Sequence, residues 1–456
     1  PRIREIGEGD DLLMTMHGMF WKFPKTFSAK STGGIRPRSS YLKVIGDFAR
    51  WDDKLVFGCD DAAKNEFLNT RKAKGKVAGP AKSQSNLWFV EPYSIDRLGP
   101  PIGRAGVWVN DKVKVGEWSD PFLIDGFERR SVHLAHDAGR DVTFQFSADH
   151  DGSGDWKPMI AATVGEDGYH WLDLEAGGPT VWVRVKTDAD CEATVWFELR
   201  NADKRQTNER FKWNTTTSRP ADSYIVGGLL RAGDRKQGLQ ILATAIQSRE
   251  ETDAGYYELT PDLELIRKDD PEQAAWMRKN IALPQDTIEI DAASAIYTDD
   301  SGNRWRLPIG NPVYRDRPHL ANLQRTSREV TTERDLFQCA GTFFELPARN
   351  AGGFAKIRPI ATHPYFIQDY CSWRGMLALT GFNPVTSQGT HRFIKSDDLK
   401  AAVWLGAVDD LWELGKPTGK GGPWKNTNIK AGEWSDPYLM TGYDKRSLSL
   451  SHNADN

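Results

Sequence analysis

Gly116-Glu-Trp-Ser-Asp-Pro-Phe-Leu123 returns later in the chain as Gly432-Glu-Trp-Ser-Asp-Pro-Tyr-Leu439. The match continues from Gly126-Phe-Glu-Arg-Arg-Ser-Val-His-Leu-Ala-His136 to Gly442-Tyr-Asp-Lys-Arg-Ser-Leu-Ser-Leu-Ser-His452, with a constant offset of 316 residues and no gap. A match of this length is an internal duplication. An internal duplication restricts the fold before any secondary structure is assigned.

Short runs of alternating or β-branched residues dominate the sequence between and around the two copies. Gly, Asp, Asn and Pro separate these runs, as hairpin turns require. One helix is predicted at Pro271–Asn280, with Asp270 as its N-cap and proline at the first helical position. We therefore expect an all-β protein with one short helix in a loop. The clearest predicted strands are 54–57, 86–90, 142–146, 180–185, 193–199 and 402–405.

The duplication extends upstream of the near-identical block, because Gly46–Trp51 resembles Gln368–Trp373. Each copy then spans roughly ninety residues, which is more than one blade of a β-propeller. With a blade of roughly 63 residues, about five blades separate the copies and about seven fill the chain. We expect residues 1–456 to form a single seven-bladed β-propeller with an internal repeat at 116–137 and 432–453. The second copy stops after its first strand, so either the N-terminal strand closes the ring or the last blade is truncated.

Two turn sequences support this interpretation. Thr298–Trp305 fits the Asp-box pattern Ser/Thr-x-Asp-x-Gly-x-x-Trp, in which Asp300 would cap the turn, Gly302 would take positive φ and Trp305 would pack beneath the hairpin. Ser147–Trp156 resembles a longer version of this turn. Such hairpins recur in propellers that handle sugars.

The composition is typical of a water-exposed globular protein and excludes few functions. Hydrophobic residues make up 39% and charged residues 27%, and the net charge of −3 favours neither nucleic acid nor an anionic membrane as a partner. Seventeen tryptophans either fill a β core or stack on flat ligands such as sugar rings. We expect a monomer. The four scattered cysteines are expected to be buried free thiols, and one disulfide between Cys339 and Cys371 remains an alternative.

Two histidines are the candidate acid–base residues. His17 lies in the apolar segment Leu12–Pro24, where burial would lower the pKa of its imidazole and could let it serve as an acid or base near neutrality. The alternative is a core histidine bonded to the backbone. His363 ends a polar stretch and can move a proton, whereas a salt-bridge network is the structural alternative for that stretch.

Several polar residues near strand ends are candidate substrate ligands, because propellers present ligand groups in the loops that follow strands. Turn capping is the alternative explanation for many of them. Arg358 can hold a substrate carboxylate through its two-pronged guanidinium. The candidates are Asp60, Asp61, Asn65, Glu66, Gln84, Asn86, Glu345 and Arg358.

No cofactor and no metal ion are predicted. Asp149-x-Asp151-x-Ser153 imitates part of a calcium loop, but Ile160 stands at the twelfth position where a calcium loop has Glu. A hairpin turn is the preferred interpretation, with calcium as the weak alternative. Signatures of nucleotide-dependent enzymes and serine hydrolases are missing from the sequence.

The stretches Asp47–Asn69, Glu333–His363 and Asp409–Pro417 resemble the seven-bladed propellers of glycoside hydrolase family 145 and the related rhamnose–glucuronate lyases. The resemblance implies an enzyme that removes rhamnose from glucuronate at the ends of plant arabinogalactan chains. It implies a histidine acid–base, carried onto His17, for hydrolysis. For elimination it implies Arg358 and His363. Ala340 departs from the family pattern, in which a polar residue precedes Gly-Thr-Phe.

Three functions remain open from the sequence. The first is hydrolysis of a terminal rhamnose–glucuronate linkage, and the second is β-elimination at the same glucuronate by a polysaccharide lyase. The third is a non-catalytic propeller that binds glycans or protein, because a fold alone guarantees no chemistry. An oligo- or polysaccharide partner and a periplasmic or extracellular location are expected for the first two, with no nucleic acid or membrane partner.

Overall fold

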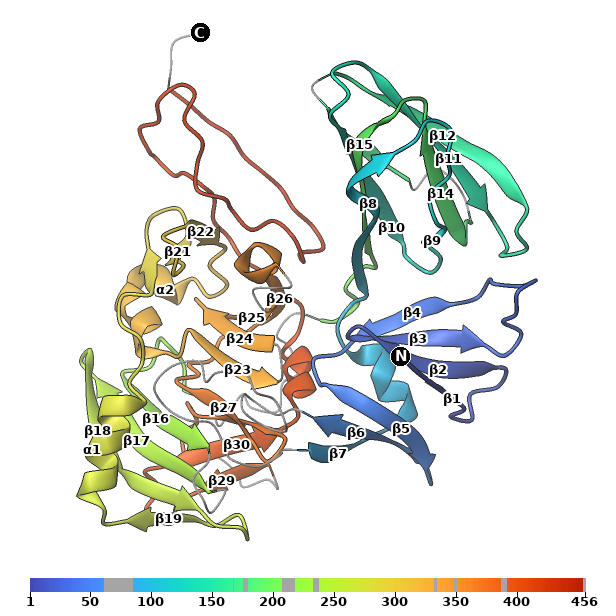
Figure 1. Cartoon of the computed structure of the whole chain (residues 1–456). Helices are drawn as coiled ribbons and strands as arrows, with labels where there is room; N and C mark the ends of the chain where they lie inside the picture. Colours follow the sequence, from blue (N-terminus) through green and yellow to red (C-terminus); the bar gives the residue numbers. More distant parts are fainter. Residues whose placement is uncertain are drawn as a thin grey trace. The chain divides into compact units, whose positions relative to one another are not determined.

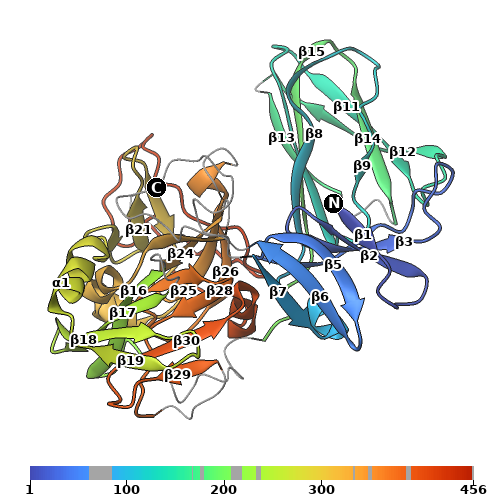
Figure 2. The ribbon, with the colours of Figure 1, turned by 60° about the horizontal axis from the view of Figure 1, so that its bottom comes forward.

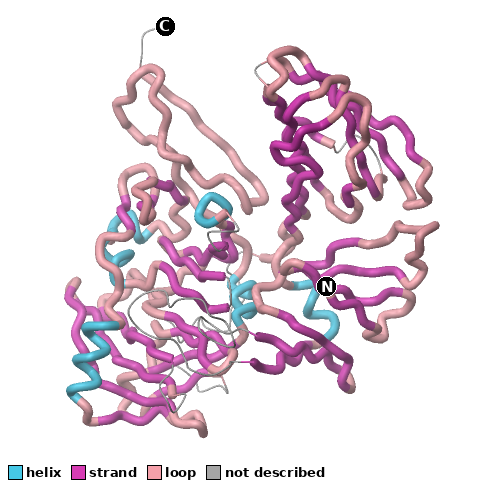
Figure 3. Tube along the Cα trace, viewed as in Figure 1, coloured by secondary structure: helices cyan, strands magenta, loops and turns pink. Residues whose placement is uncertain are grey.

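The computed structural model describes residues 1–453 except 61–84, 167, 175–178, 207–217, 233–237, 332–333, 348–351 and 387–391. Strands dominate the chain (Figures 1 and 3). The described strands form eight antiparallel sheets, which confirms the all-β class. The chain groups into two compact units. The expectation that residues 1–456 form a single domain remains a prediction. Unit 1 comprises Pro1–Tyr41, Ile45–Phe57 and Phe89–Lys204, and unit 2 comprises Leu42–Val44, Gly58–Trp88 and Arg205–Asn456.

Unit 1 begins with a four-stranded meander in the order β1-β2-β3-β4. A two-residue turn joins β2 to β3, and a register shift between Phe20 and Trp21 lets β4 pair with β3. The strands are β1 (Arg2–Arg4), β2 (Asp11–Met16), β3 (Met19–Pro24) and β4 (Arg36–Ser40).

Residues 102–200 form an eight-stranded sandwich within unit 1. One sheet has the order β13-β10-β15-β8 and the other β12-β11-β14-β9 (Figure 2). This order, in which all sequence neighbours except β11 and β12 lie in opposite sheets, is that of a jelly roll. The strands are β8 (Ile102–Val113), β9 (Phe122–Leu123), β10 (Arg129–His136), β11 (Val142–Asp149), β12 (Trp156–Val164), β13 (Tyr169–Asp173), β14 (Trp182–Thr187) and β15 (Cys191–Arg200).

The two sheets of the jelly roll enclose one apolar core. Alternate residues of each strand point into it, so Val132 and Leu134 of β10 are fully buried, as is Val195 of β15. Phe122 of β9 stacks on Phe197 of β15 with 4.3 Å between ring centroids. The first copy of the duplicated block therefore supplies two strands, β9 and β10, to this core.

A further sheet has the order β5-β6-β7, and its residues are divided between the two units. A short 3-10 helix, η1 (Pro92–Arg97), follows β7. The strands are β5 (Ile45–Trp51), β6 (Lys54–Asp60) and β7 (Ser85–Val90).

Unit 2 contains four more small sheets, in the orders β16-β17-β18-β19, β20-β21-β22, β23-β24-β25-β26 and β27-β28-β30-β29. Their strands are β16 (Tyr224–Ala232), β17 (Leu239–Gln247), β18 (Glu250–Leu259), β19 (Leu265–Lys268), β20 (Ile288–Ile290), β21 (Ala295–Thr298), β22 (Arg304–Leu307), β23 (Ser327–Thr331), β24 (Arg334–Cys339), β25 (Thr342–Pro347), β26 (Arg358–Thr362), β27 (Tyr370–Trp373), β28 (Met376–Leu379), β29 (Phe393–Lys395) and β30 (Ala402–Gly406). The helices are α1 (Pro271–Asn280), α2 (Val313–Asp316), η3 (Pro318–Leu323), η5 (Gly353–Lys356) and η6 (Val408–Leu414).

The helix predicted at Pro271–Asn280 is confirmed as α1, and its cap is the predicted one, since the Gln273 amide donates to Asp270 at 2.9 Å. The short helices α2, η3, η5 and η6 were not predicted. The hairpin at Thr298–Trp305 is confirmed, and Asp299, the neighbour of the predicted cap Asp300, accepts the backbone amides of Ser301 and Asn303 at 2.9 and 3.0 Å. Asp299 also accepts from the Trp305 ring nitrogen at 3.0 Å.

The longer turn in Ser147–Trp156 is also a hairpin, between β11 and β12. Both carboxylate oxygens of Asp149 accept backbone amides of the turn, from Gly152 and Gly154, at 2.9 Å each. All four cysteines are free thiols.

The duplication is visible in the sheets as well as in the sequence. Strands β23 to β26 repeat β1 to β4 with the same pairing. Asp11 faces Pro24 across β2 and β3, and Arg334 faces Pro347 across β24 and β25. The register shift between Phe20 and Trp21 recurs between Phe343 and Phe344. The repeat therefore reaches upstream of the near-identical block to the N-terminal sheet.

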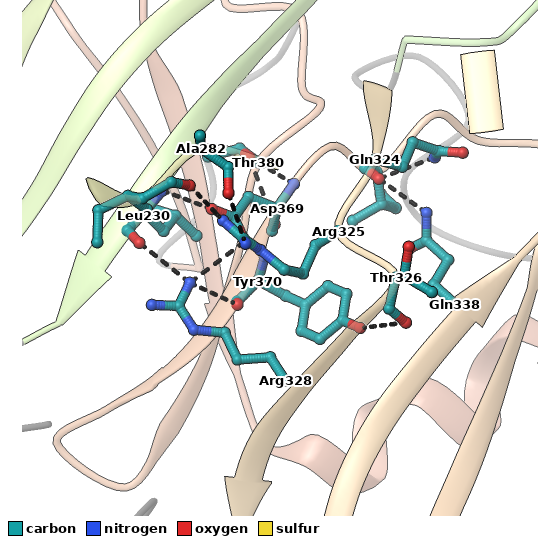
Figure 4. A network of polar contacts seen from close by, with 12 residues as sticks. Leu230, Ala282, Gln324, Arg325, Thr326, Arg328, Gln338, Asp369, Tyr370 and Thr380 are labelled. Carbon is teal, nitrogen blue, oxygen red and sulfur yellow. Dashed lines mark hydrogen bonds and ion pairs between the residues drawn. The ribbon is translucent and has the colours of Figure 1, made fainter. Parts of the chain in front are cut away.

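In both copies an aspartate near the start of the next strand pairs with an arginine of the first strand of the preceding sheet; Asp47 is the third residue of β5, and Asp369 directly precedes β27. In unit 1, Asp47 accepts two hydrogen bonds from Arg4, at 2.7 and 2.6 Å. In unit 2, the fully buried Asp369 accepts one from Arg328 at 3.2 Å and two from Arg325 at 2.9 and 3.1 Å (Figure 4). The guanidinium groups lower the pKa of Asp369, although burial alone would raise it.

Candidate functional site

His17 lies at the tip of the β2–β3 hairpin. The two-residue turn needs positive φ at both positions, and His17 (φ 50°) and Gly18 (φ 76°) provide it. The side chain is exposed, which is the opposite of the apolar setting expected from the neighbouring sequence. The turn explains this exposure, because it places His17 beyond the ends of β2 and β3, whose residues Leu13 and Phe20 are buried.

His363 is buried in unit 2 among aromatic rings. It lies parallel to Tyr365 with 6.0 Å between ring centroids and 4.8 Å from the ring of Phe343. Burial lowers its pKa to about 3, against a small raising effect of the Tyr365 amide. Neither ring nitrogen has a hydrogen-bond partner among the described residues. A histidine in this setting is uncharged near neutral pH.

The position of His363 in the repeat explains its surroundings. Tyr41 follows β4 as His363 follows β26, and Tyr41 packs on Phe20 at 4.7 Å as His363 packs on Phe343. Both positions therefore hold a ring against the hairpin of their sheet. This is the role of a core side chain.

Four of the predicted substrate ligands, Asp61, Asn65, Glu66 and Gln84, lie outside the described residues. Asp60 ends β6, and its amide donates to the carbonyl of Val44 at 2.8 Å. Asn86 is the second residue of β7, and its side-chain oxygen accepts from Lys43 Nζ at 3.3 Å.

The other two predicted ligands, Glu345 and Arg358, form an ion pair across β25 and β26. Arg334 Nε reaches the other oxygen of Glu345 at 3.3 Å and Arg334 also donates to the carbonyl of Leu42 at 2.7 Å. The guanidinium of Arg358 is thus already paired with a protein carboxylate. This is the salt-bridge alternative that the sequence left open.

Sequence analysis missed the buried carboxylate beside this ion pair as a site residue. Asp409 accepts the backbone amides of Leu42 and Lys43 at 2.8 and 2.9 Å, and the ring N–H of Trp412 at 2.9 Å. Full burial raises its pKa to about 6, although these donors and Lys43 oppose the shift. Asp409 does lie in a stretch that the sequence analysis singled out, Asp409–Pro417.

We call these residues the Asp409 cluster: Lys43, Asn86, Arg334, Glu345, Arg358, Asp409 and Trp412. The structure brings three predicted residues, Asn86, Glu345 and Arg358, into or beside one network. The cavity at its edge has a volume of about 10 Å³ and is lined by Leu42, Arg334 and Glu345 among others. That volume holds about one water molecule. The cluster can hold charge and a proton in this conformation, but it does not hold a sugar.

A depression of about 390 Å³ lies elsewhere in unit 2, beside His319, Glu289 and Asn322. Its volume suits a small ligand. However, the Asn322 side chain already bonds the backbone of Ile288, and no aromatic ring lines the depression apart from His319.

The outer face of the sheet β13-β10-β15-β8 in unit 1 carries exposed aromatic side chains. His133 on β10 lies directly opposite Trp171 on β13 and Trp196 on β15. Because Val132, Leu134 and Val195 face the core, strand alternation places this row on the opposite side. Trp171 is 51% exposed and Tyr169, one pair further along β13, is 56% exposed.

Polar groups lie between and beside these rings. The Tyr169 hydroxyl and His133 Nδ1 share a hydrogen bond of 2.8 Å. The next pairs in register place Asp173 and Glu198 on either side of Ser131. Gly106 on β8 lies opposite Trp196. We call Tyr169, Trp171, His133 and Trp196 the aromatic platform.

The outer face of the other jelly-roll sheet provides an instructive contrast. Its aromatic side chains are stacked against cations. The guanidinium of Arg184 lies 4.4 Å from the ring centroid of Trp118 and 4.3 Å from that of Trp156, and Lys186 lies 4.7 Å from Trp118. These rings are used within the protein. Tyr169 and Trp171 of the aromatic platform, by contrast, are each more than half exposed.

Comparison with protein-family models and with curated proteins finds no match to this chain. Within the described part of the chain, no helix is long and apolar enough to cross a membrane. The same residues contain no grouping of three or more His, Cys, Asp or Glu side chains able to hold a metal ion.

Proposed function

We propose that the protein binds glycans through the aromatic platform of its jelly roll. The observation that carries the proposal is the cross-strand row Trp171, His133 and Trp196, with Tyr169 beside it, on an exposed sheet face. Flat aromatic rings stack on the C–H faces of sugars, and the hydroxyls at a sugar's edge need hydrogen-bonding partners beside the ring. The platform supplies both kinds of group.

The spacing also favours an extended ligand. Trp171 and Trp196 lie on strands separated by β10, so their attachment points are about 10 Å apart. Two rings at this separation suit a chain of sugars better than a single sugar. Asp173 and Glu198 lie beside the rings, and Glu198 forms an ion pair with Arg104 at 3.4 Å. Lectin domains commonly use the jelly-roll fold, although the fold alone assigns no ligand.

Glycan cleavage is the second candidate function. The Asp409 cluster favours it, because a carboxyl group with a pKa near 6 beside basic side chains is suited to proton transfer near neutral pH. We propose the rhamnose–glucuronate linkage of arabinogalactan as the substrate, cleaved by hydrolysis or alternatively by elimination. His17 and His363, the acid–base residues expected from the sequence, are an exposed turn residue and a buried core residue.

The finer fold assignment also stays a proposal. Six of the eight described sheets are small sheets of three or four strands, as propeller blades are, and the jelly roll accounts for the other two. We propose that these small sheets belong to a propeller of about seven blades. A secreted location, periplasmic or extracellular, would fit a protein that meets plant glycans.

The decisive experiment is calorimetric titration of the protein with gum arabic and with a uronate-free polysaccharide. We expect Trp171→Ala and Tyr169→Ala each to weaken binding by at least about tenfold. Trp156→Ala is the matched control, because it removes an aromatic side chain from the other face of the same jelly roll, and its binding should equal that of the parent protein. Equal binding by all variants would refute the platform.

Product analysis of the same gum arabic mixtures separates binding from cleavage. Free rhamnose without an unsaturated uronate chromophore indicates hydrolysis, whereas the chromophore indicates elimination. Loss of product in Asp409→Asn with unchanged binding would assign chemistry to the Asp409 cluster. Binding without any product would leave glycan binding as the function.

A further inference from the structure

The outer face of the jelly-roll sheet β12-β11-β14-β9 carries two neighbouring cations without a carboxylate partner. Arg184 and Lys186 are alternate residues of β14, so their side chains leave the same side of the sheet. Val183 and Val185 alternate with them and face the core, which places both cations on the outer face. Neither cation forms an ion pair or a side-chain hydrogen bond with the residues that the structure describes.

Two indole rings hold the Arg184 guanidinium but leave its N–H groups without acceptors. The guanidinium lies 4.4 Å from the ring centroid of Trp118 and 4.3 Å from that of Trp156. Cation–π attraction offsets part of its charge, whereas its N–H donors require oxygen acceptors. Nε of Arg184 is buried and has no acceptor among the described residues. A buried donor in this state costs free energy unless a ligand or water accepts from it.

Lys186 adds a second positive charge beside the first. Its Nζ lies 4.7 Å from the ring centroid of Trp118, so both cations contact the same indole. Like charges at such short range repel one another, and a bound anion removes that repulsion. Gln145 lies opposite Lys186 on β11, and its exposed side-chain amide also has no hydrogen-bond partner in the described part of the chain.

The loop that carries Trp118 is fixed against β14. The Ser119 amide donates to the carbonyl of Val185 at 2.8 Å, and the Val185 amide donates to the Ser119 hydroxyl at 3.1 Å. A further bond of 2.9 Å joins the Gly116 amide to the carbonyl of Thr187. The indole is therefore held beside both cations before any ligand arrives, which lowers the ordering cost of binding.

Other cations of the same jelly roll have carboxylate partners. Lys114 pairs with Asp190 at 2.8 Å, and Lys157 pairs with Asp155 at 2.8 Å. A purely structural role for Arg184 would account for its contacts with the two indoles. It would not account for two adjacent cations without an acceptor.

We propose that Arg184 and Lys186 bind a doubly charged tetrahedral oxyanion, which is inorganic sulfate, inorganic phosphate or a phosphate monoester. The guanidinium would donate to two of its oxygens and the ammonium group to a third, with the Gln145 amide as a further donor. A carboxylate has one charge and two oxygens, so it uses fewer of these donors. The site lies on the other sheet of the jelly roll from the aromatic platform and does not depend on it.

The test is calorimetric titration of the full chain with sulfate, with phosphate and with glucose 6-phosphate, at an ionic strength held constant with sodium chloride. We expect saturable binding, and Arg184→Gln and Lys186→Gln should each weaken it at least about tenfold. Acetate should bind at least about tenfold more weakly than sulfate. Tighter binding of glucose 6-phosphate than of phosphate would identify an ester as the ligand, whereas equal binding would identify the free ion.

The matched control is Lys114→Gln, which removes the same charge from a lysine that is already paired, and it should keep the parent affinity. Arg184→Gln also removes a cation from between two indoles, so its thermal unfolding is compared with that of the parent. Lys186→Gln leaves the Arg184 contacts in place and carries the test if Arg184→Gln is unstable. Absence of saturable binding, equal binding by Lys186→Gln and the parent, or an equal loss in Lys114→Gln overturns the proposal.

Discussion

The two copies of the duplicated block have nearly the same sequence but different surroundings. Residues 116–137 contribute β9 and β10 to a closed apolar core, whereas residues 432–453 contact β22 at one end and expose their leucines at the other. Trp118 stacks on Arg184 and Lys186, and its counterpart Trp434 is 98% exposed. The residues of the duplicated block therefore form a sheet only where partner strands are present. Their own propensity does not suffice.

The upstream parts of the copies differ less, because each brings its own partners. Sheets β1–β4 and β23–β26 share strand order, turn and register shift. Their differences lie in burial. Asp47 and Arg4 are about half exposed, while Asp369 is inaccessible and Arg325 adds a second guanidinium to it. The same aspartate–arginine ion pair is therefore exposed in the first copy and buried in the second.

The largest expected effect tests this difference in burial. Asp369→Ala leaves Arg325 and Arg328 without their buried carboxylate, and it should lower the free energy of unfolding of unit 2 by about 3–5 kcal/mol. Asp47→Ala should shift the denaturation midpoint only slightly, since an exposed pair contributes little. Urea denaturation with hydrogen exchange at Tyr370–Trp373 and Ile45–Trp51 measures both. Equal losses would show that the two pairs do not differ in burial.

The next effect tests the difference in packing. Leu134→Ala creates a cavity in the jelly-roll core and should cost about 2–5 kcal/mol. Leu450→Ala, its counterpart, should change stability by less than about 0.5 kcal/mol, because the side chain touches mainly water. Denaturation of both variants by urea checks the pair. A large loss in Leu450→Ala would mean that the second copy is packed in solution and would break the comparison.

The sequence predicted the positions of individual strands and of α1 better than it predicted which strands pair with one another. The predicted strands at 142–146 and 193–199 lie within β11 and β15, and the cap and bounds of α1 are confirmed. These features depend on local alternation, turn residues and capping. The jelly roll was not predicted, because the pairing of β10 with β15 joins residues about sixty positions apart. A period of two identifies a strand but not the strand beside it.

The candidate site was predicted only in part, for the same reason. Asn86, Glu345 and Arg358 do lie in one region of unit 2, but the residue that links them, Asp409, is far away in the sequence. His363 was singled out for its chemistry, and its aromatic neighbours come from packing that the sequence does not show. The aromatic platform depends on register across three strands, which no local pattern specifies.

The smallest expected effect is a pH dependence of the free energy of unfolding that arises in the second copy and not in the first. Helices η1 and η6 occupy equivalent places, and Tyr93 in the first corresponds to Asp409 in the second. The pKa of Asp409 is raised to about 6 in the folded protein, against about 3.9 when unfolded. Between these values the folded state binds the extra proton, so stability must fall as the pH rises from about 4 to 6, by about 2–3 kcal/mol.

Asp409→Asn should abolish this fall, because the amide has no proton to lose, whereas Tyr93→Phe should leave it unchanged. Asp47 acts in the opposite direction. Its pKa is lowered to about 2 by Arg4, so its contribution is present above about pH 4 and disappears as the pH falls toward 2. Denaturation midpoints across about pH 4 to 7 therefore isolate Asp409 from Asp47. A midpoint that falls equally in Asp409→Asn and in the parent protein would assign the dependence to another group.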